Sequence, residues 1–238
     1  AQGVEALGVG TSAEALELRR AGIRAPILVL GTILESEAAA CLRHDVQLAL
    51  HSSDRRAMLQ RLASQMDTVA RVHLKIDTGL GRLGVSPARA VRLLEEIRGS
   101  SHLELCGVMT HLASPLGALA PETAAQIRCF QGVLEEARRG DLVRGWIHVA
   151  STAGVFTDLR PLYDAVRVGL GAYGALPADL PASGSPAGPP ELEPVMSLRT
   201  QVVFLKDIPA GAAVGYGGTW RAARPTRIAT LSVGYADG

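Results

Sequence analysis

Residues 72–85 read VHLKIDTGLGRLGV and join an apolar β-strand to a glycine-rich loop. Three charged residues lie at the junction: Lys75, Asp77 and Arg82. In parallel α/β proteins, ligands bind at the carboxyl ends of the strands and in the loops beyond them. Lys75 and Asp77 occupy alternate strand positions, so both point to one face, which is the barrel interior if the sheet closes. Burying such charges is costly unless they are paired, so this stretch is a candidate ligand site.

Short apolar runs alternate with helical patterns on both sides of this strand. Strands are expected at 4–10, 27–31, 46–50, 72–77, 105–111, 146–150 and 165–170, and helices at 12–21, 35–43, 54–63, 86–97 and 121–139. Thr11 with Glu14 forms a capping box, and Ser86 with Pro87 is a cap followed by a first-turn proline. This alternation predicts an α/β fold, a (β/α)8 TIM barrel with about seven of its eight strands. Because Ala1 is not Met and already leads into a strand, we expect the first β-α unit to lie upstream.

The composition changes after the barrel pattern. Residues 1–176 are predicted to form the barrel, and residues 177–194 a Pro/Gly-rich linker without helical or strand period. Residues 195–238 contain β-forming runs between Pro/Gly turns and predict the beginning of a C-terminal antiparallel β domain. An all-β unit of this size is marginal by itself, so we expect more sequence to follow.

The totals exclude several classes of partner. With 238 residues and 47% hydrophobic content the chain can bury a large core, and its net charge of +1 gives no reason to expect nucleic acid or an anionic membrane. Cys41, Cys106 and Cys129 are widely spaced and form no zinc or disulfide pattern, so we expect no metal and interpret them as core thiols of a cytoplasmic protein. No apolar run approaches the length of a membrane span.

The 72–85 stretch resembles the corresponding motif of the alanine racemases, which are fold-type III pyridoxal-phosphate (PLP) enzymes. Further matches follow in the family's order: THLAS at 110–114, HVASTAG at 148–154, VRVGLGAYG at 166–174, and SLRTQV, GYGGTW and GYADG between 197 and 238. The resemblance implies PLP-dependent racemisation of L-alanine to D-alanine, which supplies D-alanine for peptidoglycan. It also implies a homodimer that shares active sites across its interface.

The resemblance assigns residues to the PLP ring. Arg167 matches the family's arginine at the pyridine nitrogen, which keeps that nitrogen unprotonated and limits side reactions such as transamination. His148 matches the residue that supports this arginine, and His111 matches a histidine near the ring. The alternatives are a surface cation for Arg167 and core packing for the two histidines.

The resemblance also places the phosphate of PLP. Thr152 and the backbone N–H groups of Gly169 and Leu170 match the family's phosphate site, and such donors suit an anion. The sequence departs from the family here, because the usual Asn-Ser pair after His148 is Ser151 and Thr152. A threonine hydroxyl still donates to phosphate. The alternative is that these are ordinary turn residues.

Lys75 resembles a family lysine that is often carboxylated on Nζ and then holds Arg82. Arg82 would face the phenolic oxygen of PLP and the carboxylate of the amino acid substrate, a bidentate role that suits a guanidinium. The alternative is a direct pair of Lys75 with Asp77 or a neighbouring carboxylate.

Two bases are needed for racemisation, one on each face of the substrate. The family uses the PLP lysine and the tyrosine of a GYADG motif from the opposite subunit, which Tyr235 matches. Because the reference pKa of tyrosine is about 10, nearby cations would have to lower it.

The PLP lysine of the family lies in a Lys-Ala-Asn run at the end of the first barrel strand. Lys75 and Lys206 are the only lysines and lack that context, so we expect this stretch to be inactive alone and assign the function to the intact protein. The alternatives are an amino-acid racemase of broader specificity, a non-catalytic PLP-binding barrel, and a split or degenerate gene product that has lost the lysine strand.

Overall fold

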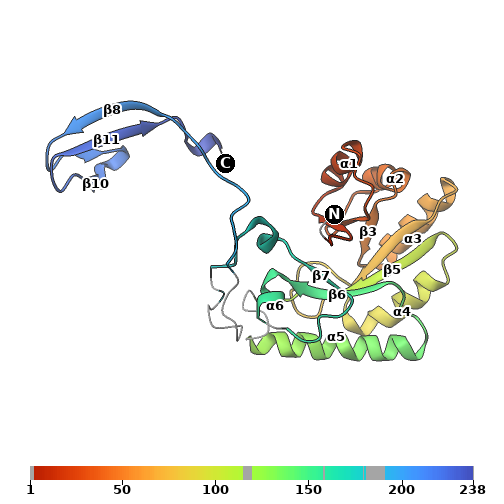
Figure 1. The fold of residues 1–238 in the computed structure, drawn as a ribbon. Helices are drawn as coiled ribbons and strands as arrows, with labels where there is room; N and C mark the ends of the chain where they lie inside the picture. The colour runs from red at the N-terminus through yellow and green to blue at the C-terminus, as the bar shows by residue number, and fades with distance from the viewer. Residues whose placement is uncertain (1–2, 115–119, 158, 179, 181–190, 238) are drawn as a thin grey trace. The chain divides into compact units, whose positions relative to one another are not determined.

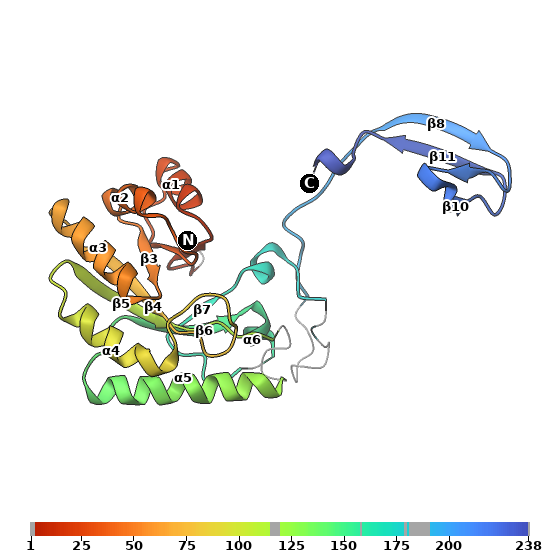
Figure 2. The ribbon, with the colours of Figure 1, turned by 180° about the vertical axis from the view of Figure 1, so that it is seen from behind.

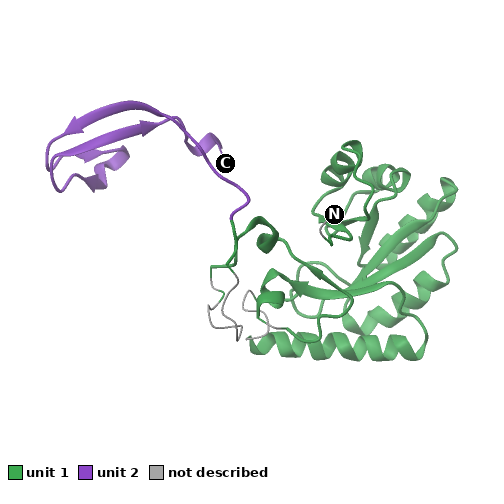
Figure 3. Cartoon of the chain, in the orientation of Figure 1, with its two compact units in different colours: residues 1–193 green, residues 194–238 purple. Residues whose placement is uncertain are grey.

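The computed structural model describes residues 3–114, 120–157, 159–178, 180 and 191–237. The chain divides into two compact units, Ala1–Glu193 and Pro194–Gly238 (Figure 3). Most of the predicted linker, residues 181–190, lies outside the described residues.

The first unit is built on one sheet of seven parallel strands in the unbroken order β1 to β7. The strands are β1 Leu7–Val9, β2 Ile27–Val29, β3 Gln47–Leu50, β4 Ala70–Lys75, β5 Leu103–Met109, β6 Trp146–Ser151 and β7 Ala165–Arg167. The helices are α1 Ser12–Arg20, α2 Glu35–Arg43, α3 Ser53–Gln65, α4 Pro87–Arg98, α5 Pro121–Arg139 and α6 Thr152–Phe156. The predicted α/β barrel of seven strands is confirmed, and the sheet is nearly closed (Figure 1).

The helices α1 to α5 follow the outside of the sheet, each in contact with the next (Figures 1 and 2). The core lies between sheet and helices, where Leu48, Leu50 and Leu74 from the strands and Phe130 and Leu134 from α5 are buried. Each such side chain stabilises the fold by about 1.5–3 kcal/mol relative to an exposed one. The strands are thereby held in a fixed frame for residues at their carboxyl ends.

Local signals at helix starts are confirmed in part. The Thr11–Glu14 capping box is present at α1, and Pro87 is the first residue of α4. Ser86 is the N-cap residue of α4, as predicted, although its side chain makes no capping hydrogen bond. Proline at the first position has no N–H, so one of the helix's unpaired donors is already absent.

Several strand bounds differ from the prediction by a few residues, and two of these differences affect the candidate site. β5 begins at Leu103 and ends before His111, and β7 ends at Arg167 instead of continuing to Leu170. The chain turns at Gly169 and enters a short 3₁₀ turn, Leu170–Tyr173. These earlier ends place His111 and Gly169 in the loops beyond the strands.

The second unit contains the predicted antiparallel β structure. Strands β8 Val202–Ile208 and β11 Thr226–Leu231 pair antiparallel, as do β9 Ala213–Val214 and β10 Trp220–Arg221. No described helix in either unit is both long enough and apolar enough to cross a membrane.

Candidate active site

The loop after β4 is closed by backbone hydrogen bonds at its two ends. The N–H of Val85 donates to the carbonyl of Lys75 and the N–H of Asp77 to that of Val85, both at 2.9 Å. Gly84 has φ of +143°, and a Cβ there would lie 2.5 Å from the backbone nitrogen of Asp77. Only glycine fits this close approach. The loop therefore returns to the strand end and holds Arg82 beside it.

Asp77 stabilises the loop instead of neutralising Lys75. Its Oδ1 accepts the N–H groups of Gly79 and Gly81, each at 3.0 Å. Burial alone would raise the pKa of Asp77, but these hydrogen bonds and the charge of Lys75 hold it below its ordinary value. Within the described ranges, no ion pair joins Lys75 to Asp77 or to another carboxylate. The direct pair considered from the sequence is thus absent.

Lys75 is a buried cation among other cations. Its side chain points into the barrel interior and is 5% exposed. Burial lowers its pKa, and the charges of Arg82 and Arg167 lower it further, with Asp77 opposing. The amine is therefore more often neutral at a given pH than an ordinary lysine. Arg82 itself is exposed.

Arg167, the last residue of β7, is held by backbone carbonyls. Its Nη1 donates to the carbonyl of His148 at 2.9 Å, and its Nη2 to those of Thr110 and Val149 at 2.8 and 2.9 Å. Burial lowers the pKa of Arg167 to about 10. The guanidinium remains charged at neutral pH and is fixed in orientation, which excludes the surface-cation alternative.

Two imidazoles also accept hydrogen bonds from Arg167. Nδ1 of His148 lies 2.9 Å from Nη1, and Nδ1 of His111 lies 3.1 Å from Nη2. Burial, followed by the charges of Arg167, Lys75 and Arg82, lowers the pKa of His111 to about 4. Burial and Arg167 likewise hold the pKa of His148 well below its ordinary value. Both rings are neutral near pH 7, as acceptors from a guanidinium must be.

The predicted phosphate residues meet at the carboxyl ends of β6 and β7. Oγ1 of Thr152 accepts the N–H groups of Gly169 and Gly171, each at 3.2 Å. Gly171 was not among the predicted residues. Leu170 begins the 3₁₀ turn, and its N–H has no partner among the described residues. Thr152 is buried and joins the two loops, so it is more than an ordinary turn residue.

Tyr235 lies in the second unit, in a short 3₁₀ turn Tyr235–Asp237. Its side chain is fully exposed. Within the first unit, the structure brings Lys75, Arg82, His111, His148 and Arg167 together.

Three residues that contact the site were missed by sequence reasoning. His73 contacts His148, and Gln47 contacts His73. Gln126 on α5 donates to Thr78 and to the carbonyl of His111, and so connects two loops of the site. His73 could have been found from strand alternation, because it lies two residues before Lys75 and is therefore on the same face of β4.

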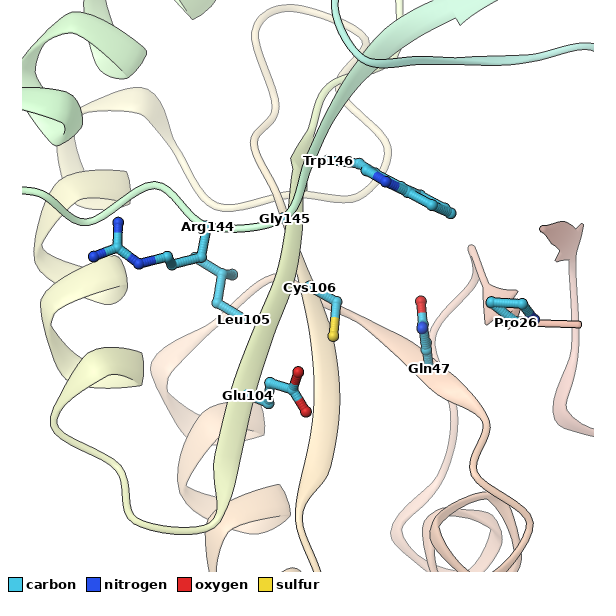
Figure 4. Close-up of a pocket in the computed structure, with 8 residues that line it drawn as sticks. All are labelled: Pro26, Gln47, Glu104, Leu105, Cys106, Arg144, Gly145 and Trp146. Atoms are coloured by element: carbon cyan, nitrogen blue, oxygen red, sulfur yellow. The ribbon is translucent and has the colours of Figure 1, made fainter. Parts of the chain in front are cut away.

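A cavity of about 500 Å³ lies at the opposite end of the barrel, at the amino ends of β3, β5 and β6. Gln47, Cys106 and Trp146 point toward this space (Figure 4). Burial raises the pKa of the Cys106 thiol to about 11, so it is a weak nucleophile. In such barrels the amino-end face serves stability and the carboxyl-end face binds ligands.

Fold and site together define a parallel (β/α) barrel protein with a cluster of cationic side chains at the carboxyl ends of its strands. A family model described as "Alanine racemase, N-terminal domain" matches residues 1–177, and "Alanine racemase, C-terminal domain" matches residues 195–238. The chain belongs to the alanine racemase family.

Curated relatives and solved structures agree with this assignment. The chain is 38% identical over 236 residues to alanine racemase of Symbiobacterium thermophilum, and 37% over 242 residues to that of Citrifermentans bemidjiense. These alignments cover 99% of the chain but 61% and 62% of the relatives, so the chain spans about three fifths of their length.

Two crystal structures share the fold. Alanine racemase from the D-cycloserine producing Streptomyces lavendulae matches with a TM-score of 0.89 at 29% identity, covering 99% of this chain and 62% of that one. Biosynthetic alanine racemase from Pseudomonas aeruginosa matches with a TM-score of 0.83 at 33% identity, covering 100% and 63%.

Proposed function

We propose that the full-length protein is a PLP-dependent alanine racemase that interconverts L- and D-alanine. The observation that carries this proposal is the Arg167 guanidinium, which is fixed by carbonyls and imidazoles on both Nη atoms. Its Nε–H has no hydrogen-bond partner among the described residues, which leaves one donor for a ligand.

The residues fit PLP at this point. A pyridine nitrogen is an acceptor only while it is unprotonated, and Arg167 offers only donors. The two histidines beside it are neutral and already accept from Arg167, so neither supplies a proton to the ring. Bound PLP supplies an electron-withdrawing ring that stabilises negative charge at the substrate α-carbon. A neutral nitrogen makes that ring a weaker electron sink, which favours return of a proton to the substrate α-carbon.

The phosphate is proposed to lie against Thr152 and the turn after β7. The oxygen of Thr152 accepts two backbone N–H groups, so its own hydroxyl hydrogen remains free to donate. The N–H of Leu170, which has no partner within the described ranges, is a second donor. The N–H of Gly169 donates to Thr152, so we expect Gly169 to contribute by shaping the turn.

Lys75 is proposed to be carboxylated on Nζ. A neutral amine is the form that reacts with CO₂, and burial beside Arg82 and Arg167 favours the neutral form. The carbamate product is an anion and would neutralise these cations in a buried place. Arg82 would then be held toward the substrate carboxylate.

Tyr235 is proposed as the base on the second substrate face, contributed by the partner in a homodimer. Its full exposure leaves the phenol available to another subunit.

The free cysteines are consistent with a cytoplasmic enzyme. The D-alanine that this enzyme forms would serve peptidoglycan.

The test uses the full-length protein freed of PLP by hydroxylamine and dialysis. We expect D-alanine to form from L-alanine only after PLP is restored. PLP binding without exchange of the α-hydrogen of either enantiomer would instead support a non-catalytic PLP-binding barrel. Faster turnover of serine or lysine than of alanine would indicate a racemase of broader specificity.

A further inference from the structure

The barrel interior contains a continuous hydrogen-bond chain that extends beyond the ligand site. Nε2 of His73 lies 2.8 Å from Oε1 of Gln47, and Nδ1 of His73 lies 2.9 Å from Nε2 of His148. Nδ1 of His148 in turn accepts from Arg167 at 2.9 Å. We call Gln47, His73, His148 and Arg167 the interior chain.

The proton positions along the interior chain follow from its Arg167 end. A guanidinium has only donors, so Nδ1 of His148 must be the acceptor. A neutral imidazole has one N–H, which is therefore on Nε2 of His148 and points to Nδ1 of His73. His73 must then carry its proton on Nε2, and the Gln47 amide must present its oxygen. Each hydrogen bond of the interior chain therefore has one donor and one acceptor, and the assignments are mutually consistent.

The contact between the two histidines depends on a glycine. His73 is on β4 and His148 on β6, and the strand between them, β5, places Gly107 opposite His73. A Cβ at Gly107 would lie 2.4 Å from Nδ1 of His73 and 2.6 Å from the carbonyl of Trp146. The missing side chain is what lets the two rings meet across β5, with their planes at 81°.

Gln47 is the end of the interior chain farthest from the ligand site. It is the first residue of β3 and lines the cavity at the amino ends of the strands (Figure 4). His73 and His148 are buried, at 1% and 3% exposure, so Gln47 is the member through which the chain meets that cavity.

We propose that Gln47 and His73 are positioning residues that act through His148 to hold the Arg167 guanidinium in its ligand-facing orientation. The Gln47 oxygen selects the His73 tautomer, which selects the His148 tautomer and keeps an acceptor turned to Arg167. Without that oxygen, His73 is free to carry its proton on Nδ1 and to donate to His148. His148 would then present an N–H to Arg167, a donor facing a donor. The expected effect on racemisation rests on the function proposed above. The expected tautomers of His73 and His148 do not depend on that function.

The test is solid-state NMR of the full-length protein with ¹⁵N-labelled histidine, recorded without PLP and again with PLP. We expect Nε2 of His148 to be protonated and Nδ1 to be unprotonated in the wild type. Gln47→Leu is expected to give a mixture of the two tautomers, and Gln47→Glu, which retains an acceptor oxygen, is expected to restore the wild-type state. Gln60→Leu is the matched control, because Gln60 contacts His102 at 3.2 Å outside the interior chain.

A second readout is the kinetics of the PLP-loaded enzyme. Loss of one neutral hydrogen bond in the interior chain predicts that Gln47→Leu lowers kcat about fivefold while KM for alanine stays within about twofold. A His148 that is protonated on Nδ1 in the wild type would overturn the proposal, as would an unchanged tautomer in Gln47→Leu. If the tautomers behave as expected but the protein does not racemise alanine, the positioning role stands and the proposed function fails.

Discussion

The guanidinium of Arg167 donates to Nδ1 of His148 across 2.9 Å, from the end of β7 to the middle of β6. The same Nη1 also reaches the carbonyl of His148. A guanidinium held at two points of one residue has little freedom to rotate. The orientation of Arg167 is therefore a property of the barrel frame and does not depend on a ligand.

Arg167→Glu is expected to slow racemisation by about 10- to 100-fold, the effect of losing one charged hydrogen bond worth about 1.5–3 kcal/mol. A carboxyl at this position favours a protonated ring, so we also expect more conversion of PLP to pyridoxamine phosphate. Turnover in both directions and the loss of PLP measure these effects. Arg92→Glu, an exposed arginine of α4, is the control. Unchanged turnover in Arg167→Glu would remove Arg167 from its proposed role.

Tyr235→Phe is expected to impair removal of the α-proton from one enantiomer by about 10²- to 10⁴-fold, the usual contribution of a general base. The other enantiomer should still exchange its α-hydrogen, because its base is a different group. Hydrogen exchange of D- and L-alanine in deuterated water measures each direction. Tyr216→Phe is the control, since Tyr216 is a fully exposed tyrosine of the same unit. Equal losses in both directions would contradict a base on each face.

Carboxylation of Lys75 is expected to give a ¹³C carbamate resonance when the full-length protein is incubated with labelled bicarbonate. The buried, lowered-pKa amine favours the reaction near neutral pH. The signal should persist in Lys206→Arg and disappear in Lys75→Arg. Lys206 is the only other lysine of residues 1–238, so Lys206→Arg is the matched control and loss of the signal in Lys75→Arg assigns it. A signal that survives Lys75→Arg would place the modification elsewhere.

The stability of the barrel unit is expected to fall on acidification. Burial, followed by the charge of Arg167, lowers the pKa of His73 to about 4 from 6.5. Between these values the unfolded chain binds more protons than the folded one, so the free energy of unfolding rises with pH across this window. The stabilisation is complete above about pH 6.5 and is lost as pH falls toward 4. His73 alone accounts for about 2 kcal/mol between pH 7 and pH 5.

Denaturant unfolding of a Trp220→Phe background measures this effect, because Trp146 is then the only tryptophan of residues 1–238 and lies in the barrel unit. His73→Gln should reduce the difference in unfolding free energy between pH 7 and pH 5. His102→Gln, a histidine outside the interior chain, should not. An equal pH dependence in the wild type and His73→Gln would show that the pKa of His73 is the same in the folded and unfolded states, contrary to this account.

Much of the barrel was predictable because its signals are local. The helices at 35–43 and 121–139 have the predicted bounds, since each is set by nearby residues such as Pro121 at the start of α5. The end of β7 was not predictable in this way. The turn at Gly169 is held by Thr152, seventeen residues earlier, and no local pattern reports that contact.

The candidate site was predictable only where a motif exists. The resemblance named His148 and Arg167, and the structure places them in direct contact. It did not name Gln47 or His73, whose partners lie 26 and 75 residues away in the chain. Such contacts depend on strand register and on the missing Cβ of Gly107, which are properties of the folded sheet.

The ¹⁵N resonance of the pyridine nitrogen in the full-length holoenzyme, loaded with labelled PLP, tests the central role of Arg167 most directly. We predict the shift of an unprotonated nitrogen in the wild type, and a change toward the protonated shift in Arg167→Glu. A protonated nitrogen in the wild type would contradict the proposal that Arg167 donates to the ring.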